Sequence, residues 1–289
     1  MAVLDTAGGG LARTLPSGTA PYGVAVSPDG RRVHVTDFDG GRLWTIGVAD
    51  AAVTGTVQVG AGPGCVAVPG DGGLAYVTGY RDGTVSIVDT AAGAVVAAIE
   101  TGGNPANIAF SPDGGRAYVP DFSRGMVHVL DVPSASVCGT IAVGADPNGV
   151  AVSPDGTRVY VTNSARGDGT LSVIDAATGT VAARVAVDPG PFGVALAPDG
   201  RRAYVTGYYN DTVCVVDTGL SAAVASIPVG RRPENVAVAP DGSRVYVTEQ
   251  HGRSVSVLDA AGSVVTTVEL GGTPGAIAVG PAEPSRPSP

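Results

Sequence analysis

Three observations in the sequence predict an all-β fold, and specifically a seven-bladed β-propeller. A proline recurs at intervals of 41 to 44 residues, at positions 21, 63, 105, 147, 191, 233 and 274. Each interval carries four short runs of mostly β-branched and small residues. Nearly constant turn sequences separate these runs. A period in the low forties that contains four strands is typical of one propeller blade.

The four strands of each repeat, A to D, follow from these runs. Strand A is expected at residues 24–26 and strand B at residues 33–35, joined by Ser27-Pro28-Asp29-Gly30. In this turn the proline fixes φ, the aspartate binds its own backbone and the glycine supplies a positive φ. Strands C and D are expected at sites such as residues 85–87 and 95–97, joined by a turn that begins at an aspartate. Each repeat is therefore an antiparallel meander.

The repeat leaves no place for a domain boundary, so we predict one propeller domain over residues 1–280. Six complete four-stranded repeats run from about residue 18 to 270. Residues 1–6 and 11–15 resemble strands C and D of another repeat, and residues 275–279 resemble its strand A. We therefore expect a closing blade shared by the two termini, which would protect the sheet edges. Residues 281–289 form a Pro/Ser-rich tail that we expect to be disordered.

Composition excludes several classes of function. The net charge is −9 and every basic residue is arginine, so nucleic acid is not the expected partner and lysine chemistry is absent. The three cysteines never occur at metal or redox spacing, and the motifs of nucleotide and haem sites are missing, so no organic cofactor is expected. Residues 1–15 do not resemble a leader, so none is expected, and no apolar run of membrane-spanning length occurs. We expect a cytoplasmic protein, monomeric and without a membrane partner.

A tetrapeptide in strand B carries a family resemblance. Tyr160-Val161-Thr162-Asn163 is repeated in part as Tyr-Val-Thr at residues 76–78, 204–206 and 246–248. The chain resembles the YVTN family of β-propeller repeats, which are related to NHL repeats. The resemblance implies the propeller fold. For function it implies little, because propellers of this family include surface-layer modules, subunits of redox enzymes, ligand binders and lyases.

The loops that join strands B to C and D to A differ between repeats, whereas the turns on the other face hardly change. Binding sites usually occupy such variable loops on a rigid scaffold. We therefore predict a ligand site at this face, where the loops carry many aromatic side chains. The alternative is that these aromatic side chains only pack between blades. The predicted ligand-binding residues are Tyr22, Phe38, Tyr80, Asn107, Phe122, Asn148, Phe192, Tyr208, Tyr209 and Asn235.

The sixth repeat places a histidine and two carboxylates near the same rim. His251, Glu234 and Glu249 are the candidate catalytic residues, because a carboxylate beside an imidazole makes a general base. The alternative is an ordinary solvated loop. Glu234, Asn107 and Asn148 are candidate oxygen ligands for Mg²⁺ or Ca²⁺.

Three other side chains are weaker candidates. His34 replaces the strand B tyrosine of the other repeats, which favours packing; His128 lies among apolar neighbours; and Cys65 has no histidine nearby in the sequence.

These observations predict a propeller that binds a small polar or cationic molecule, or a peptide segment, at its variable face. The alternative is a lyase, cyclase or hydrolase that needs no organic cofactor and uses the histidine and glutamate pair, with or without a divalent metal. A third possibility is a purely structural interaction module.

Overall fold

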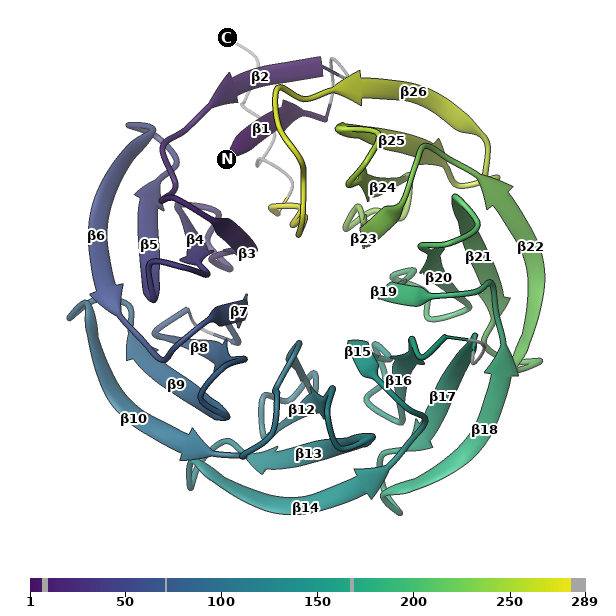
Figure 1. The fold of residues 1–289 in the computed structure, drawn as a ribbon, viewed down its shortest axis with the longest axis horizontal. Coiled ribbons are helices and arrows are strands. Elements are labelled where there is room, and N and C mark those ends of the chain that lie inside the picture. The colour runs from purple at the N-terminus through teal and green to yellow at the C-terminus, as the bar shows by residue number, and fades with distance from the viewer. Residues whose placement is uncertain (7–9, 71, 167–168, 282–289) are drawn as a thin grey trace, which may run out of the picture.

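The computed structural model describes residues 1–6, 10–70, 72–166 and 169–281. Over these residues the chain forms six four-stranded antiparallel sheets and one two-stranded sheet. The sheets stand around a central axis, with strand A of each repeat innermost and strand D outermost (Figure 1). The all-β propeller fold predicted from the repeat is confirmed.

The strands of each four-stranded sheet follow one another in the chain and pair with their sequence neighbours. The first two sheets contain β3 (Pro21–Val26), β4 (Arg32–Asp37), β5 (Arg42–Gly47) and β6 (Ala52–Gln58), then β7 (Pro63–Ala67), β8 (Leu74–Gly79), β9 (Thr84–Asp89) and β10 (Ala94–Glu100). The third and fourth contain β11 (Ala109–Phe110), β12 (Arg116–Asp121), β13 (Met126–Asp131) and β14 (Ser136–Ala142), then β15 (Pro147–Val152), β16 (Arg158–Asn163), β17 (Thr170–Asp175) and β18 (Thr180–Ala186). The fifth and sixth contain β19 (Pro191–Leu196), β20 (Arg202–Gly207), β21 (Thr212–Asp217) and β22 (Ala222–Pro228), then β23 (Pro233–Val238), β24 (Arg244–Glu249), β25 (Ser254–Asp259) and β26 (Val264–Glu269).

The N-terminal strands and the segment that follows β26 lie between the sixth and first sheets (Figure 1). The predicted strands C and D of the closing blade form as β1 (Ala2–Asp5) and β2 (Gly10–Thr14), which pair with each other. The predicted strand A at residues 275–279 is not a strand. The segment still closes the ring, because the Ala276 N–H donates to the Tyr22 carbonyl (3.2 Å) and Ile277 packs against the sixth sheet. The six complete four-stranded blades that we predicted are therefore present, whereas the predicted seventh blade is not completed by the described residues.

The closing blade stays incomplete because nothing in the described chain supplies its strand B. Residues 280 and 281 are Gly and Pro, and Pro lacks the N–H that a ladder needs. Residues 282–289, most of the tail for which we predicted disorder, lie outside the described residues.

Apolar side chains fill the space between neighbouring sheets. One cluster joins Tyr76 and Ile87 of the second sheet to Ala117 and Leu130 of the third, and similar clusters lie between the other pairs. His34 occupies the tyrosine position of the first sheet and is buried (1% exposed). Its expected packing role agrees with this position.

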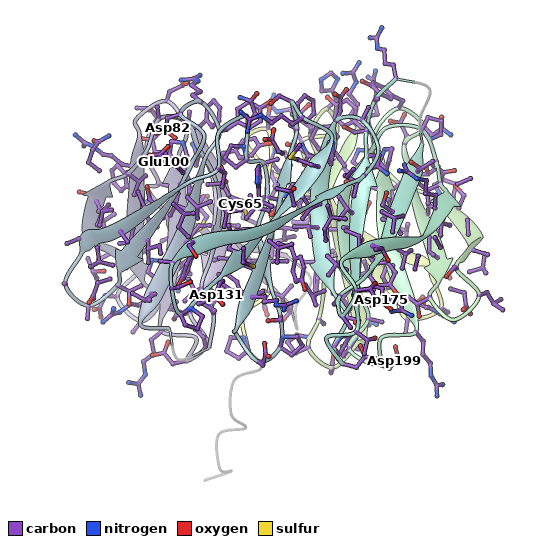
Figure 2. The ribbon with its side chains drawn as sticks, turned by 90° about the horizontal axis from the view of Figure 1, so that it is seen from below. Cys65, Asp82, Glu100, Asp131, Asp175 and Asp199 are labelled. Carbon is purple, nitrogen blue, oxygen red and sulfur yellow. The ribbon has the colours of Figure 1, made fainter. Side chains whose placement is uncertain are left out.

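The ring has two faces that differ in how their connections are built. We call the side with the A-to-B and C-to-D turns the turn face and the opposite side the loop face. Figure 2 shows Asp131, Asp175 and Asp199 on the turn face and Asp82 on the loop face. Five of the A-to-B turns share one geometry. Their glycines have φ between 69° and 72°, and each glycine N–H donates to the carbonyl three residues earlier at 2.8 to 2.9 Å; these glycines are Gly30, Gly114, Gly156, Gly200 and Gly242.

A repeated hydrogen bond links neighbouring sheets beside the central axis. In five of the six four-stranded sheets the penultimate residue of strand B is a threonine that uses its hydroxyl twice. It accepts from an N–H of its own strand A. It also donates to a carbonyl at the start of strand A of the next sheet, to the Ala106 carbonyl shortly before β11, or, from the sixth sheet, to the Gly275 carbonyl. Both distances lie between 2.7 and 3.0 Å. We call this arrangement the threonine latch, and its members are Thr36, Thr78, Thr162, Thr206 and Thr248.

The third sheet has Pro120 at the latch position, so it has no hydroxyl there. The Ala106 N–H donates to the Pro120 carbonyl (2.9 Å), so the backbone edge of Pro120 faces strand A. A proline therefore removes an N–H from the A side of the sheet and leaves pairing with strand C intact. Strand β11 accordingly shortens to two residues, Ala109 and Phe110.

Candidate functional site

A cavity of about 540 Å³ lies at the loop face, where the A strands begin. Eight of the predicted ligand-binding residues line it, as does Glu234. Tyr208 and Tyr209 do not belong to the lining among the described residues. The lining residues of the prediction are Tyr22, Phe38, Tyr80, Asn107, Phe122, Asn148, Phe192, Asn235 and Glu234.

Four aromatic rings from three sheets form a continuous wall of the cavity. Ring centroids are 5.7 Å apart for Tyr22 and Phe38, 6.4 Å for Phe38 and Tyr80, and 6.2 Å for Tyr80 and Phe122. We call these four residues the aromatic arc. Phe38, Tyr80 and Phe122 follow strand B at a spacing of 42 residues, so the repeat itself sets their contact. The rings both pack between blades and line the cavity. Packing between blades and a place in a ligand site, the two alternatives left open by the sequence, are therefore compatible.

An arginine side chain already contacts one ring of the aromatic arc. The Arg81 guanidinium carbon lies 4.5 Å from the Phe38 ring centroid, and the same guanidinium pairs with Asp39 at 3.0 Å. Both charged side chains are more than half exposed. The arc can therefore hold a cation against a ring face, and neither Arg81 nor Asp39 belongs to the cavity lining.

A second aromatic group stands beside the fifth sheet. Phe192 lies in the cavity wall, with Tyr208 5.5 Å behind it and Tyr209 5.4 Å further on, by ring centroids. Tyr209 is 52% exposed. Of these three predicted binding residues, the structure brings only Phe192 to the cavity.

Glu234 is the acidic group of the cavity. It is only 6% exposed, and loss of solvent raises the pKa of its carboxyl to about 7. Its carboxylate accepts a hydrogen bond from the Gln250 side-chain amide (2.9 Å). The neighbouring Tyr22 hydroxyl and this amide partly oppose the rise in pKa. Desolvation and the nearby Glu234 charge in turn raise the pKa of Tyr22.

The hydrogen bonds of Glu234 continue to the molecular surface. The Tyr208 hydroxyl donates to the Gln250 side-chain carbonyl (2.7 Å), and the Arg232 guanidinium donates to the Tyr208 hydroxyl (3.2 Å). Arg232 also lies over the Tyr208 ring, 5.1 Å from its centroid. Tyr208 therefore acts behind the cavity wall, where it orients the amide that binds Glu234. The sequence singled out Tyr208 but gave no reason to connect it with Gln250.

The structure does not bring the three candidate catalytic residues together. His251 is exposed and outside the cavity lining, and its backbone N–H donates to the Arg231 carbonyl (3.2 Å). Glu249 is fully buried inside the sixth sheet, where it accepts hydrogen bonds from the Gly230 N–H (2.6 Å) and from the hydroxyls of Ser254 and Ser256. Glu234 is the member of the three that reaches the cavity.

The position of Glu249 explains other polar residues that end strand B. Asp37 accepts from the Ala20 N–H (2.9 Å), Asp121 from the Asn104 N–H (3.1 Å) and Asn163 from the Gly144 N–H (3.0 Å). These side chains hold the loop that leads into strand A. Variation between repeats at this position therefore reflects several solutions to one structural task.

The second sheet ends strand B in Gly79 and shows the same task solved elsewhere. Asp82, three residues later, accepts from the Ala61 N–H (2.5 Å). When strand B ends in glycine, the acidic residue that accepts this hydrogen bond therefore occurs a few positions later in the loop. This offset is a sequence signal that distinguishes the structural role from a ligand site.

The weaker candidates are placed as follows. Burial lowers the pKa of His34 to about 4, and His34 Nδ1 lies 3.1 Å from the Thr45 hydroxyl. His128 is buried, with Nε2 3.2 Å from Asp121 Oδ2. Cys65 lines the cavity, but burial raises the pKa of its thiol to about 11, which keeps it protonated and poorly nucleophilic.

The described residues contain no group of three or more His, Cys, Asp or Glu side chains that could hold a metal ion. Glu234, Asn107 and Asn148 line the same cavity, but together they offer only one carboxylate and two side-chain amides. The Asn107 side-chain oxygen already accepts from the Ile108 N–H (3.0 Å). The Mg²⁺ or Ca²⁺ site stays a prediction that this donor set supports weakly.

No helix long and apolar enough to span a membrane occurs among the described residues.

No family model matches the sequence, and no curated protein does. A solved structure described as Kuenenia stuttgartiensis Hydrazine Synthase resembles it with a TM-score of 0.83 and 22% sequence identity. The similarity covers 91% of this chain and 90% of that chain. At this identity the likeness shows the β-propeller fold alone. In all, 1639 chains of solved structures match, so the fold alone does not identify a function. The residues of the cavity have to provide that evidence.

Proposed function

We propose that this β-propeller binds a small organic cation in the cavity of its loop face, between the aromatic arc and Glu234. The observation that carries the proposal is the meeting of a continuous aromatic wall and a single buried carboxylate in one cavity of about 540 Å³. Aromatic faces and a carboxylate are the groups that recognise ammonium ligands. The volume suits a molecule of modest size.

The charge of the lining favours a cation over an anion. Glu234 is the one carboxylate among the described lining residues, and no arginine or histidine accompanies it. The net charge of −9 acts in the same direction at longer range. A bound ammonium would stabilise the charged form of Glu234, so binding would expel a proton below pH 7.

Glu234 also supports the alternative of an enzyme. A carboxyl with a pKa of about 7 that contacts a tyrosine hydroxyl is suited to acid–base chemistry near neutral pH. In that alternative Glu234 is the proton-transferring group and Tyr22 positions it. His251 is not among the residues that line the cavity.

Two finer assignments belong to the same proposal. The Tyr-Val-Thr sequences at the ends of β8, β16, β20 and β24 support membership of the YVTN-type repeats. The β1–β2 sheet and the segment at residues 275–279 support a seventh, incomplete blade built by both termini.

Titration calorimetry with pentylammonium tests the proposed function. We expect Glu234→Gln to weaken binding at pH 8 by roughly tenfold or more, because a charge-assisted contact is lost. In the wild-type protein the affinity should rise about tenfold from pH 6 to pH 8, as Glu234 ionises. Glu100→Gln removes an exposed carboxylate on the outer strand β10 and controls for net charge. Equal affinities of the wild type and Glu234→Gln, or no binding by either, would overturn the proposal.

A further inference from the structure

The break in the threonine latches leaves two backbone groups of the cavity wall without their usual partner. At the other five positions one hydroxyl oxygen serves both an N–H and a carbonyl. The equivalent groups at the third sheet are the N–H of Asn107 and the carbonyl of Asn148. Pro120 offers them no hydroxyl, and within the described residues neither group has a hydrogen bond.

Both residues face the cavity rather than a neighbouring sheet. Asn107 and Asn148 belong to its lining. Neither takes part in strand pairing, because β11 begins only at Ala109 and the register of β15 jumps from Pro147 to Val150. A donor and an acceptor that one oxygen atom bridges elsewhere in the ring are therefore available to a ligand here.

The order of these two groups selects a chemical class. A carboxamide offers a carbonyl to the Asn107 N–H and an N–H to the Asn148 carbonyl, so it satisfies both. A carboxylate has no donor and would meet the Asn148 carbonyl unfavourably. A hydroxyl satisfies both groups through one oxygen atom, as the latch threonines do, whereas a carboxamide satisfies them through a separate acceptor and donor.

We propose that the Asn107 and Asn148 backbone forms an amide-binding edge, opened by Pro120, and that the ligand of the cavity carries a carboxamide. This inference rests on the proposed cation site and names the second pole of the same ligand. The ammonium end contacts Glu234 in the sixth sheet, and the amide end contacts the junction of the third and fourth sheets. The molecule so defined is a small ω-amino amide or a similar cationic amide.

A matched pair of probes tests the amide edge. Pentylammonium and 5-aminopentanamide share the ammonium and the chain, and differ in the terminal carboxamide. We expect the amide probe to bind the wild-type protein about tenfold more tightly, the effect of one or two hydrogen bonds. Pro120→Thr restores the latch hydroxyl and should bring this ratio close to one without changing the affinity for pentylammonium. Pro120→Val introduces a side chain of nearly the same shape as threonine but without the hydroxyl. The amide probe should therefore still bind this variant about tenfold more tightly than pentylammonium.

Nuclear magnetic resonance with acetamide provides a readout that does not depend on the cation site. Acetamide should shift the Asn107 backbone amide signal in the wild type and in Pro120→Val, but not in Pro120→Thr. If Pro120→Thr fails to fold, Thr162→Val serves instead, because it frees the Gly149 N–H and the Phe192 carbonyl at the next junction. Acetamide should then shift the Gly149 signal as well.

The outcomes separate the two proposals. Pentylammonium binding that depends on Glu234, together with an affinity ratio near one in the wild type, overturns the amide edge and leaves the cation site standing. Failure of both amines to bind, with a saturable acetamide shift at Asn107, overturns the cation site and supports the amide edge. Absence of any acetamide shift at Asn107 overturns the amide edge whatever the amines do.

Discussion

Two carboxylates on opposite faces of the ring, Asp155 and Glu234, respond to the fold in opposite ways. On the turn face Asp155 accepts hydrogen bonds from Ser153 and Thr157, its close neighbours in the chain, and these bonds lower its pKa to about 2. On the loop face desolvation raises the pKa of Glu234 to about 7, and one of its partners, Tyr22, comes from the other end of the chain. A carboxylate served by its sequence neighbours builds a turn, whereas one assembled by distant segments is a candidate for function.

Glu249 sharpens the comparison because it lies on the loop face but acts as a structural residue. Both of its oxygens accept hydrogen bonds from within the sixth sheet and its entering loop. Face alone therefore does not identify a functional carboxylate; its access to the cavity does.

The largest effect should follow from removing this structural carboxylate. Glu249→Ala leaves the Gly230 N–H and two serine hydroxyls buried without their acceptor. We expect a loss of about 4 kcal/mol in the free energy of unfolding, measured by urea denaturation. The exposed Glu100→Ala should change it by less than about 0.5 kcal/mol. A stable Glu249→Ala protein that no longer binds pentylammonium would instead place Glu249 at the functional site.

The second effect concerns how Glu234 links stability to pH. Its pKa is higher in the folded protein, about 7, than the ordinary 4.5, so the folded state holds the proton more tightly. The stabilisation is complete below pH 4.5 and is lost as the pH rises to about 7, with a size of about 3 kcal/mol. The difference in unfolding free energy between the wild type and Glu234→Gln should fall over this range.

Taking that difference removes an opposing contribution from His34, which both proteins share. Its lowered pKa, about 4, contributes stability that is present above pH 6.5 and lost as the pH falls. A difference that stays flat from pH 4.5 to 7 would show that Glu234 is well solvated and that folding does not raise its pKa.

The smallest effect is expected on the turn face. Ser153→Ala removes the leading hydrogen bond to Asp155, so the pKa of Asp155 should rise from about 2 toward 3.8. Carbon-detected nuclear magnetic resonance of the carboxyl signal measures this directly, with Asp113 in the unaltered third repeat as the internal reference. No change in ligand affinity should accompany it. An altered affinity would mean that the turn face communicates with the cavity.

The sequence predicted those parts of the molecule that depend on local chemistry repeated at a fixed period. The blades, their turns and the positions of Phe38, Tyr80 and Phe122 all follow from the spacing of 42 residues. The absence of strand A from the closing blade was not predicted, because a short apolar run such as residues 275–279 becomes a strand only if a partner strand exists.

The site could be predicted only in part, because direction matters as much as position. Glu234 and Glu249 both lie near the rim in the sixth repeat, yet one side chain enters the cavity and the other enters the sheet. Pro120 stood in the sequence as a departure from Tyr-Val-Thr. Its effect could not be inferred until the threonine hydroxyls were seen to join neighbouring sheets.

The missing latch also bears on the mechanics of the ring. Two latches connect the first three sheets, and two more connect the fourth, fifth and sixth, while a fifth joins the sixth sheet to the segment that contacts Tyr22. The inner circle of hydrogen bonds is thus an open arc whose free ends meet at Pro120. A ligand that must widen the circle to enter should therefore do so at the third and fourth sheets, where separating them breaks no latch.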